Sequence, residues 1–146
     1  MDLGCYPVSF ITMLLEKVNL INFEDFKVLN KKVEIGETGV DINSTIEMKV
    51  DEKIAIKLSS SFKENIGSAT EIHGSRGSIK IINTWRGSPG IILKKDNNKN
   101  IIKFDQIEDI YFDQLNTISN DLLNESNGQN MDNMLLNMKI IDQWLS

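Results

Sequence analysis

The spacing of hydrophobic residues changes twice along the chain, from helical to alternating and back to helical. Residues 7–17 are predicted to form a helix, because Val8, Ile11 and Leu15 recur at positions i, i+3 and i+7. Pro7 fits the first turn, where its missing N–H would have had no partner. Since apolar residues occupy most sides of this segment, we expect the helix to be buried against several neighbours.

Extended segments are predicted between residues 26 and 104. Hydrophobic and polar residues alternate imperfectly over residues 26–35. They alternate regularly over residues 42–50 and 54–62, which are joined by a short turn, and this pattern is typical of an antiparallel hairpin with one buried face. Two more hairpins are expected. One joins residues 69–73 to 78–83 through Gly74-Ser75-Arg76-Gly77, and the other joins residues 91–93 to 101–104 through the turn formers of residues 96–100.

The hairpin formed by residues 42–50 and 54–62 has two unlike faces. The apolar face is expected to lie beneath helices, and it consists of Ile42, Ile46, Met48, Ile54, Ile56 and Leu58. The opposite face is more polar and includes Thr45, Glu47 and Lys57, so we expect it to meet a second subunit or solvent.

Helical spacing returns after residue 104. One predicted stripe consists of Ile107, Ile110, Tyr111, Leu115, Ile118 and Leu122. A polar break over residues 124–130 precedes a final helix at 131–145, whose inward side is expected to carry Met134, Leu135, Met138, Ile141 and Leu145. Strands and helices segregated in this way predict an α+β fold, with a largely antiparallel open β-sheet and helices packed on one face.

Length and charge narrow the function classes. At 146 residues the chain is expected to form a single domain, 1–146. A net charge of −5 argues against nucleic acid or an anionic membrane as a partner. The pairs Lys31-Lys32 and Lys94-Lys95 are isolated, and no clustered basic face is predicted. The sequence has no apolar run long enough to span a membrane, and no signal peptide is predicted. The single Cys5 excludes an internal disulfide and suits the cytoplasm.

The sequence lacks the residue patterns of phosphate-binding loops, metal sites and nucleophile–base pairs. Gly87-Ser88-Pro89-Gly90 lies between strands and does not open a helix, so it is not expected to bind phosphate. His73 is the only histidine and stands mid-strand beside a glycine turn, where a structural or surface role is expected. A metal site or a nucleophile–base pair would need partners that the sequence does not supply. We therefore predict no metal site and no cofactor site in this chain.

Asp2 and Tyr6 remain, at the start of the first helix. Residue types alone favour a capping carboxylate and a half-buried aromatic ring. The alternative is functional: partial positive charge at a helix N-terminus eases loss of a phenolic proton, so Tyr6 could act as an acid or base near a carbonyl oxygen.

The segment Asp2-Leu3-Gly4-Cys5-Tyr6-Pro7-Val8 resembles the motif that opens a helix in the C-terminal domain of the glucose-fructose oxidoreductase / inositol dehydrogenase (Gfo/Idh/MocA) family. Further similarity lies in Thr38-Gly39-Val40-Asp41, in the hairpin Glu71–Ile79 and in the final helix through Ile140-Ile141-Asp142. A tyrosine at position 6, where many members have histidine, resembles the branch of glucose-fructose oxidoreductase, dimeric dihydrodiol dehydrogenase and NADP-dependent xylose dehydrogenases.

The resemblance implies a catalytic acid/base role for Tyr6 and a substrate-binding role for Asp2. It also implies NAD or NADP as cofactor of the full-length enzyme, bound by an N-terminal Rossmann domain that this chain lacks. The chain is then expected to be a C-terminal substrate-binding and dimerisation domain, inactive alone, forming a homodimer through its open sheet face and pairing with a possible separate Rossmann domain. Two alternatives remain open. One is a non-enzymatic dimerisation or interaction module derived from that family, and the other is a free-standing ligand-binding domain of unrelated α+β fold.

Overall fold

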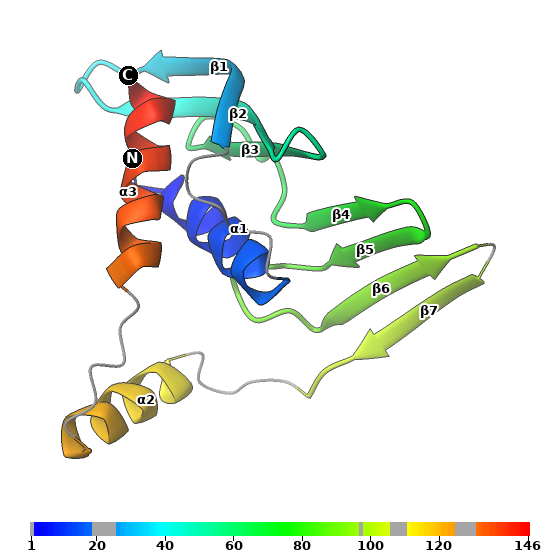
Figure 1. Ribbon diagram of the computed structural model, residues 1–146. Helices are drawn as coiled ribbons and strands as arrows, with labels where there is room; N and C mark the ends of the chain where they lie inside the picture. Colours follow the sequence, from blue (N-terminus) through cyan, green and yellow to red (C-terminus); the bar gives the residue numbers. More distant parts are fainter. Residues whose placement is uncertain (1, 19–25, 97, 106–110, 125–130) are drawn as a thin grey trace. The chain divides into compact units, whose positions relative to one another are not determined.

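The computed structural model describes residues 2–18, 26–96, 98–105, 111–124 and 131–146 (Figure 1). It confirms the predicted α+β fold class with antiparallel strands. The elements are, in chain order, α1 (Cys5–Lys17), β1 (Phe26–Ile35), β2 (Asp41–Val50), β3 (Ile54–Ser61), β4 (Thr70–Gly74), β5 (Gly77–Ile81), β6 (Gly90–Lys95), β7 (Asn98–Lys103), α2 (Phe112–Leu123) and α3 (Met131–Leu145).

The chain forms two compact units. The first contains residues 1–66 and 129–146, and the second contains residues 67–128. Each unit has its own antiparallel sheet, in the order β1-β2-β3 in the first and β4-β5-β6-β7 in the second. In both sheets, strands that are consecutive in sequence are hydrogen-bonded neighbours, as short hairpin connections require.

The first unit buries one apolar core between its sheet and two helices, α1 and α3 (Figure 1). Among the described residues, the buried core consists of Val8, Leu15, Ile46, Met48, Val50, Ile56, Leu58, Leu136, Ile140 and Trp144. The predicted apolar face of β2 and β3 is therefore confirmed for Ile46, Met48, Ile56 and Leu58, and Ile54 packs against the same core. Ile42 is only half-buried and lies against Gly36 instead.

The imperfect alternation of β1 has a structural cause. The pairing of β1 with β2 shifts between Val28 and Asn30, so Leu29 is an extra residue without a partner in the register. Val28 packs against the core whereas Leu29 is half exposed. A β-bulge of this kind re-aims the side chains that follow it, and the strand regains its core contact at Val33.

The orientation of α3 differs from the predicted one. Leu136, Ile140 and Trp144 are buried at i, i+4 and i+8, whereas four residues that were expected to point inward are exposed: Met134, Leu135, Met138 and Leu145. Only Ile141 of the predicted set packs against the core. Apolar residues occur all around α3, so its periodicity selects no single face. Trp144 is the largest buried side chain of the unit, and burying it removes the most apolar area from water.

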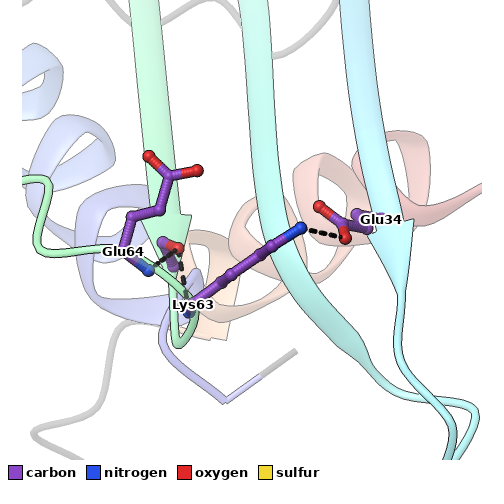
Figure 2. Close-up of polar contacts among 4 residues, drawn as sticks. Glu34, Lys63 and Glu64 are labelled. Carbon is purple, nitrogen blue, oxygen red and sulfur yellow. Dashed lines mark hydrogen bonds and ion pairs between the residues drawn. The ribbon is translucent and has the colours of Figure 1, made fainter.

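The polar face of the three-stranded sheet carries exposed charge pairs. Lys57 pairs with Glu47 at 2.9 Å on neighbouring strands. Figure 2 shows Lys63, just beyond β3, extending across β2 to Glu34 of β1, with Nζ 2.7 Å from Oε1. The same loop is closed by Ser61, whose Oγ accepts the backbone N–H groups of Lys63 and Glu64. These pairs are exposed, so each contributes little to stability.

The four-stranded sheet of the second unit has one apolar and one charged face. Residues directly opposite each other share a face, so the register gives two apolar rows: Ile81, Ile91 and Ile102 in one, and Ile72, Ile79 and Leu93 in the next. The other face carries Glu71, His73, Lys80, Lys94 and Lys99. The apolar rows are half-buried or exposed, and no side chain of α2 in the same unit is buried.

The turns of this sheet are tighter than predicted. Residues 98–100, expected in a turn, belong to β7, which pairs with β6 up to Lys95. A Cβ placed on Gly77 would lie 2.1 Å from the carbonyl oxygen of Lys94, so only glycine permits β5 and β6 to approach this closely. The helical stripe predicted after residue 104 is confirmed as α2 from Phe112, while Ile107 and Ile110 lie outside the described residues.

Candidate active site at the start of the first helix

Tyr6 stands in the first turn of α1, as the sequence predicted. Gly4 is the N-cap residue and is buried, and Val8 one turn later is fully buried in the core. The helix start is closed by the N–H of Val8, which donates to the carbonyl of Gly4 at 3.3 Å. Tyr6 itself is 56% exposed. Its ring is therefore presented to the surroundings by a backbone that the core holds in place.

The capping role considered for Asp2 is wrong. No side chain caps α1, and its N-cap position belongs to Gly4, two residues beyond Asp2. Tyr6, at 56% exposed, is close to the half-buried ring that residue types favoured. Asp2 contributes its backbone instead, because its carbonyl accepts a hydrogen bond from the thiol of Cys5 at 3.0 Å. Asp2 itself is exposed and lies four residues before Tyr6 in the sequence.

A polar network fixes α1 against α3. Thr12 is buried, and its hydroxyl lies 2.6 Å from Oδ1 of Asn137, to which it donates. Nδ2 of Asn137 donates to Ser9 at 3.2 Å, and Asn133 donates to Glu16 at 2.7 Å. These hydrogen bonds, which include the hydroxyl of the buried Thr12, hold the two helices in register. The sequence interpretation missed this network, although asparagines spaced by four on α3 were the available signal.

The described part of the chain contains neither a metal-binding cluster nor a phosphate-binding loop at Gly87–Gly90. No group of three His, Cys, Asp or Glu side chains there could hold a metal ion. His73 lies 3.3 Å from Glu71 on the surface of the four-stranded sheet. The segment Gly87–Gly90 leads into strand β6 and not into a helix, so it does not form a phosphate-binding loop.

None of the described helices is long and apolar enough to cross a membrane.

Shifted pKa values occur in surface ion pairs. The hydrogen bond from Lys57 lowers the pKa of Glu47, and the hydrogen bond from Lys80 lowers the pKa of Glu71. The hydrogen bond to Glu34 raises the pKa of Lys63. Since all three groups are fully exposed, these shifts reflect local pairing and mark no catalytic group.

One group of cations was missed by the sequence interpretation. Lys94 and Lys95 are not isolated, because they line the same hollow as Arg76, and Lys94 is directly opposite Lys99. The prediction that no basic residues cluster is therefore wrong for this end of the four-stranded sheet. Strand pairing brings together side chains that are far apart in sequence. The register of that pairing cannot be obtained from composition alone.

Sequence comparison identifies no relative. No model of a known protein family matches the chain, and no curated protein matches it.

Structural comparison does identify proteins of the same fold. The chain is similar to KijD10, a 3-ketoreductase from Actinomadura kijaniata, in complex with NADP and TDP-benzene, with a TM-score of 0.80 and 11% identity over 97% of this chain and 43% of that chain. The open conformation of KijD10 gives a TM-score of 0.78 over 94% of this chain, again at 11% identity and 43% of that chain. An aldose-aldose oxidoreductase from Caulobacter crescentus, complexed with glycerol, gives 0.76 and 14% identity over 99% of this chain and 43% of that chain.

These similarities concern the fold. The chain spans less than half the length of the solved structures that it matches. At 11–14% identity, the shared architecture does not transfer an activity or a set of site residues. The chain therefore shares its α+β fold with part of two oxidoreductases.

Proposed function

We propose that this chain is the substrate-binding and dimerisation domain of an NAD(P)-dependent oxidoreductase of the Gfo/Idh/MocA family, acting on CH–OH groups of a sugar or diol in the cytoplasm. In this proposal the chain is inactive alone and works with a separate nucleotide-binding domain. The observation that carries it is the fold similarity, which covers 94–99% of this chain but only 43–45% of chains that act as a 3-ketoreductase and an aldose-aldose oxidoreductase.

Tyr6 is the proposed acid/base. In reduction its hydroxyl would donate a proton to the carbonyl oxygen as that oxygen becomes an alkoxide, and in oxidation the phenolate would take the proton back. The nicotinamide of the cofactor would supply or accept the hydride. Asp2 is proposed to bind substrate hydroxyl groups, which a carboxylate accepts as hydrogen-bond donors.

Exposed apolar side chains on the helix pair support a separate domain. The hydrogen bonds Ser9–Asn137 and Glu16–Asn133 show that α1 and α3 run antiparallel. Their outer sides expose Tyr6 and Met13 on α1, and Met134, Leu135 and Met138 on α3. Exposed apolar groups of this kind mark surfaces that pack against another domain or ligand. A nucleotide-binding domain on this side would bring a cofactor to Tyr6.

Reconstitution tests the proposed function. Titration of NADP⁺ or NAD⁺ into the chain alone is expected to give no heat of binding by calorimetry. Mixing the chain with a matching nucleotide-binding domain is expected to give reductase activity towards sugar carbonyls, measured as loss of NADPH or NADH absorbance. Micromolar cofactor binding by the chain alone would contradict the proposal. A stable complex without turnover on any sugar or diol would favour the non-enzymatic interaction module instead.

The homodimer is proposed to form through the four-stranded sheet. Its apolar row of Ile81, Ile91 and Ile102 offers a better contact than the polar face of the three-stranded sheet, where Lys57 and Glu47 already pair with each other. Interfaces between identical chains are enriched in apolar residues of this kind.

Two neighbouring isoleucines test this interface. Ile91 and Ile92 are both half-buried on β6 but lie on opposite faces of the sheet. Ile91→Lys is expected to weaken the dimer about 10-fold or more in sedimentation equilibrium, because it places a charge in the apolar contact. Ile92→Lys is the matched control and should leave the dimer intact. A strict monomer for the unaltered chain, or equal effects of the two variants, would remove the sheet-face dimer.

A further inference from the structure

The four-stranded sheet has a strongly basic end. Gly77 is opposite Lys95, and Lys95 is opposite Asn98, so the turn joining β4 to β5 and the turn joining β6 to β7 lie at the same end of the sheet. Arg76 stands in the first turn, and Lys94 and Lys95 precede the second. Three cations thus gather at one end of a chain whose net charge is −5.

A hollow of about 460 Å³ lies at this end, open to solvent. Ile72, Ile79 and Leu93 line it from three neighbouring strands, in one row of the apolar face. Arg76, Lys94 and Lys95 line it as well. We name this feature the cationic hollow. Its volume falls within the range of about 300–1,000 Å³ that is usual for small-molecule sites.

The cations of the hollow are not neutralised by nearby carboxylates. Among the described residues, no ion pair involves Arg76, Lys94 or Lys95. Glu71 lies on the opposite face, where it is already paired with Lys80 at 2.8 Å and with His73. Asp96, in the second turn, is the one carboxylate next to Lys95 in sequence.

Lys95 is the lysine that shares this apolar face, because it lies two residues after Leu93 on β6. The side chain of Lys94 lies on the opposite face of the sheet, directly opposite Lys99. Apolar side chains beside uncompensated cations therefore match a ligand that has both an apolar body and a negative charge.

We propose that the cationic hollow binds a small soluble organic anion with an apolar body, such as an aromatic or aliphatic carboxylate, sulfonate or phosphate ester. The guanidinium of Arg76 can hold the anionic group with two parallel hydrogen bonds. Lys95 adds charge at the rim, and the apolar body lies over Ile79 and Leu93. This site belongs to the second unit, and it stands independently of the role proposed for Tyr6 in the first.

Three probes separate charge from apolar contact: the aromatic sulfonate 8-anilinonaphthalene-1-sulfonate, the uncharged N-phenyl-1-naphthylamine, and inorganic phosphate. The sulfonate is expected to give a saturable fluorescence increase on the unaltered chain. The double variant Arg76→Gln/Lys95→Gln is expected to weaken it about 10-fold, since each charge-assisted hydrogen bond contributes measurably to affinity. The matched control Lys17→Gln/Lys27→Gln removes two exposed lysines of the first unit and should leave sulfonate binding unchanged.

The other probes and a second readout complete the test. Binding of the uncharged naphthylamine should be the same in all three proteins, and phosphate alone should bind more weakly than the sulfonate. Backbone amide NMR should show sulfonate-induced shifts at Arg76, Gly77 and Leu93. The proposal is overturned if both double variants bind the sulfonate equally, if the naphthylamine loses as much affinity as the sulfonate, or if the shifts occur elsewhere.

Discussion

Trp144→Ala is expected to lower the free energy of unfolding by about 3–5 kcal/mol, the range found for removing a large buried aromatic side chain. Trp144 is fully buried and closes the apolar stripe that α3 presents to the sheet and to α1. Alanine would leave a cavity beside Leu136 and Ile140 that the rigid helix pair cannot fill by collapse. Denaturant unfolding followed by circular dichroism measures the loss, which would be a large fraction of the total stability of a small domain.

Met138→Ala on the same helix is the matched control. Met138 is 62% exposed, so its truncation should change stability by no more than about 0.5 kcal/mol. Trp144→Phe provides a second, milder variant, because it keeps most of the buried ring and removes an indole N–H that has no hydrogen-bond partner. A large loss for Met138→Ala with little change for Trp144→Ala would show that α3 buries its other side.

Tyr6→Phe is expected to reduce turnover by the reconstituted oxidoreductase about 10²–10⁴-fold, the usual contribution of a general acid or base. The ring would remain at the start of α1, and only the hydroxyl that is proposed to exchange a proton with the substrate oxygen would be lost. Because Val8 and the Thr12–Asn137 network anchor the helix, the variant should fold normally. Steady-state kinetics should show the loss mainly in kcat, with a smaller change in KM.

Tyr111→Phe removes the same hydroxyl from the other tyrosine, at the N-cap of α2, and should leave turnover unchanged. Tyr6→His is expected to recover part of the activity with a shifted pH profile, since imidazole can also donate a proton. Full activity of the Tyr6→Phe complex would refute the acid/base role. Equal losses in Tyr6→Phe and Tyr111→Phe would point to a structural effect of removing a hydroxyl.

Much of the local structure followed from the spacing of residues. The helical period of 3.6 residues and the strand period of two residues both show within a few consecutive positions. The ends of α1, β2 and β3 were therefore predicted to within about two residues. The two glycines around Arg76 predicted the turn between β4 and β5 for the same reason. A helix start next to Tyr6 was also predicted, although α1 begins at Cys5 and the capping role considered for Asp2 was not realised.

The division into two sheets depended on contacts between distant segments. The alternation of β3 and of β4 predicts strands, but it does not say whether they pair with each other. The basic end of the second sheet arose in the same way, because Arg76 and Lys95 meet only when the β5–β6 register is set. Side-chain proximity across strands depends on that register, which has no local signature.

The sequence by itself determined which segments are helices and strands, which apolar face of β2 and β3 is buried, and that a helix begins close to Tyr6. These properties depend on neighbours a few positions apart. Tertiary structure alone decided that α3 buries Trp144 rather than Met138, since both sides of that helix are apolar and the choice depends on the space left by the sheet and α1. It also decided that Asn137 holds Thr12 in place and that the helix carrying Tyr6 is thereby fixed, because hydrogen bonds between residues 125 positions apart exist only in the folded chain.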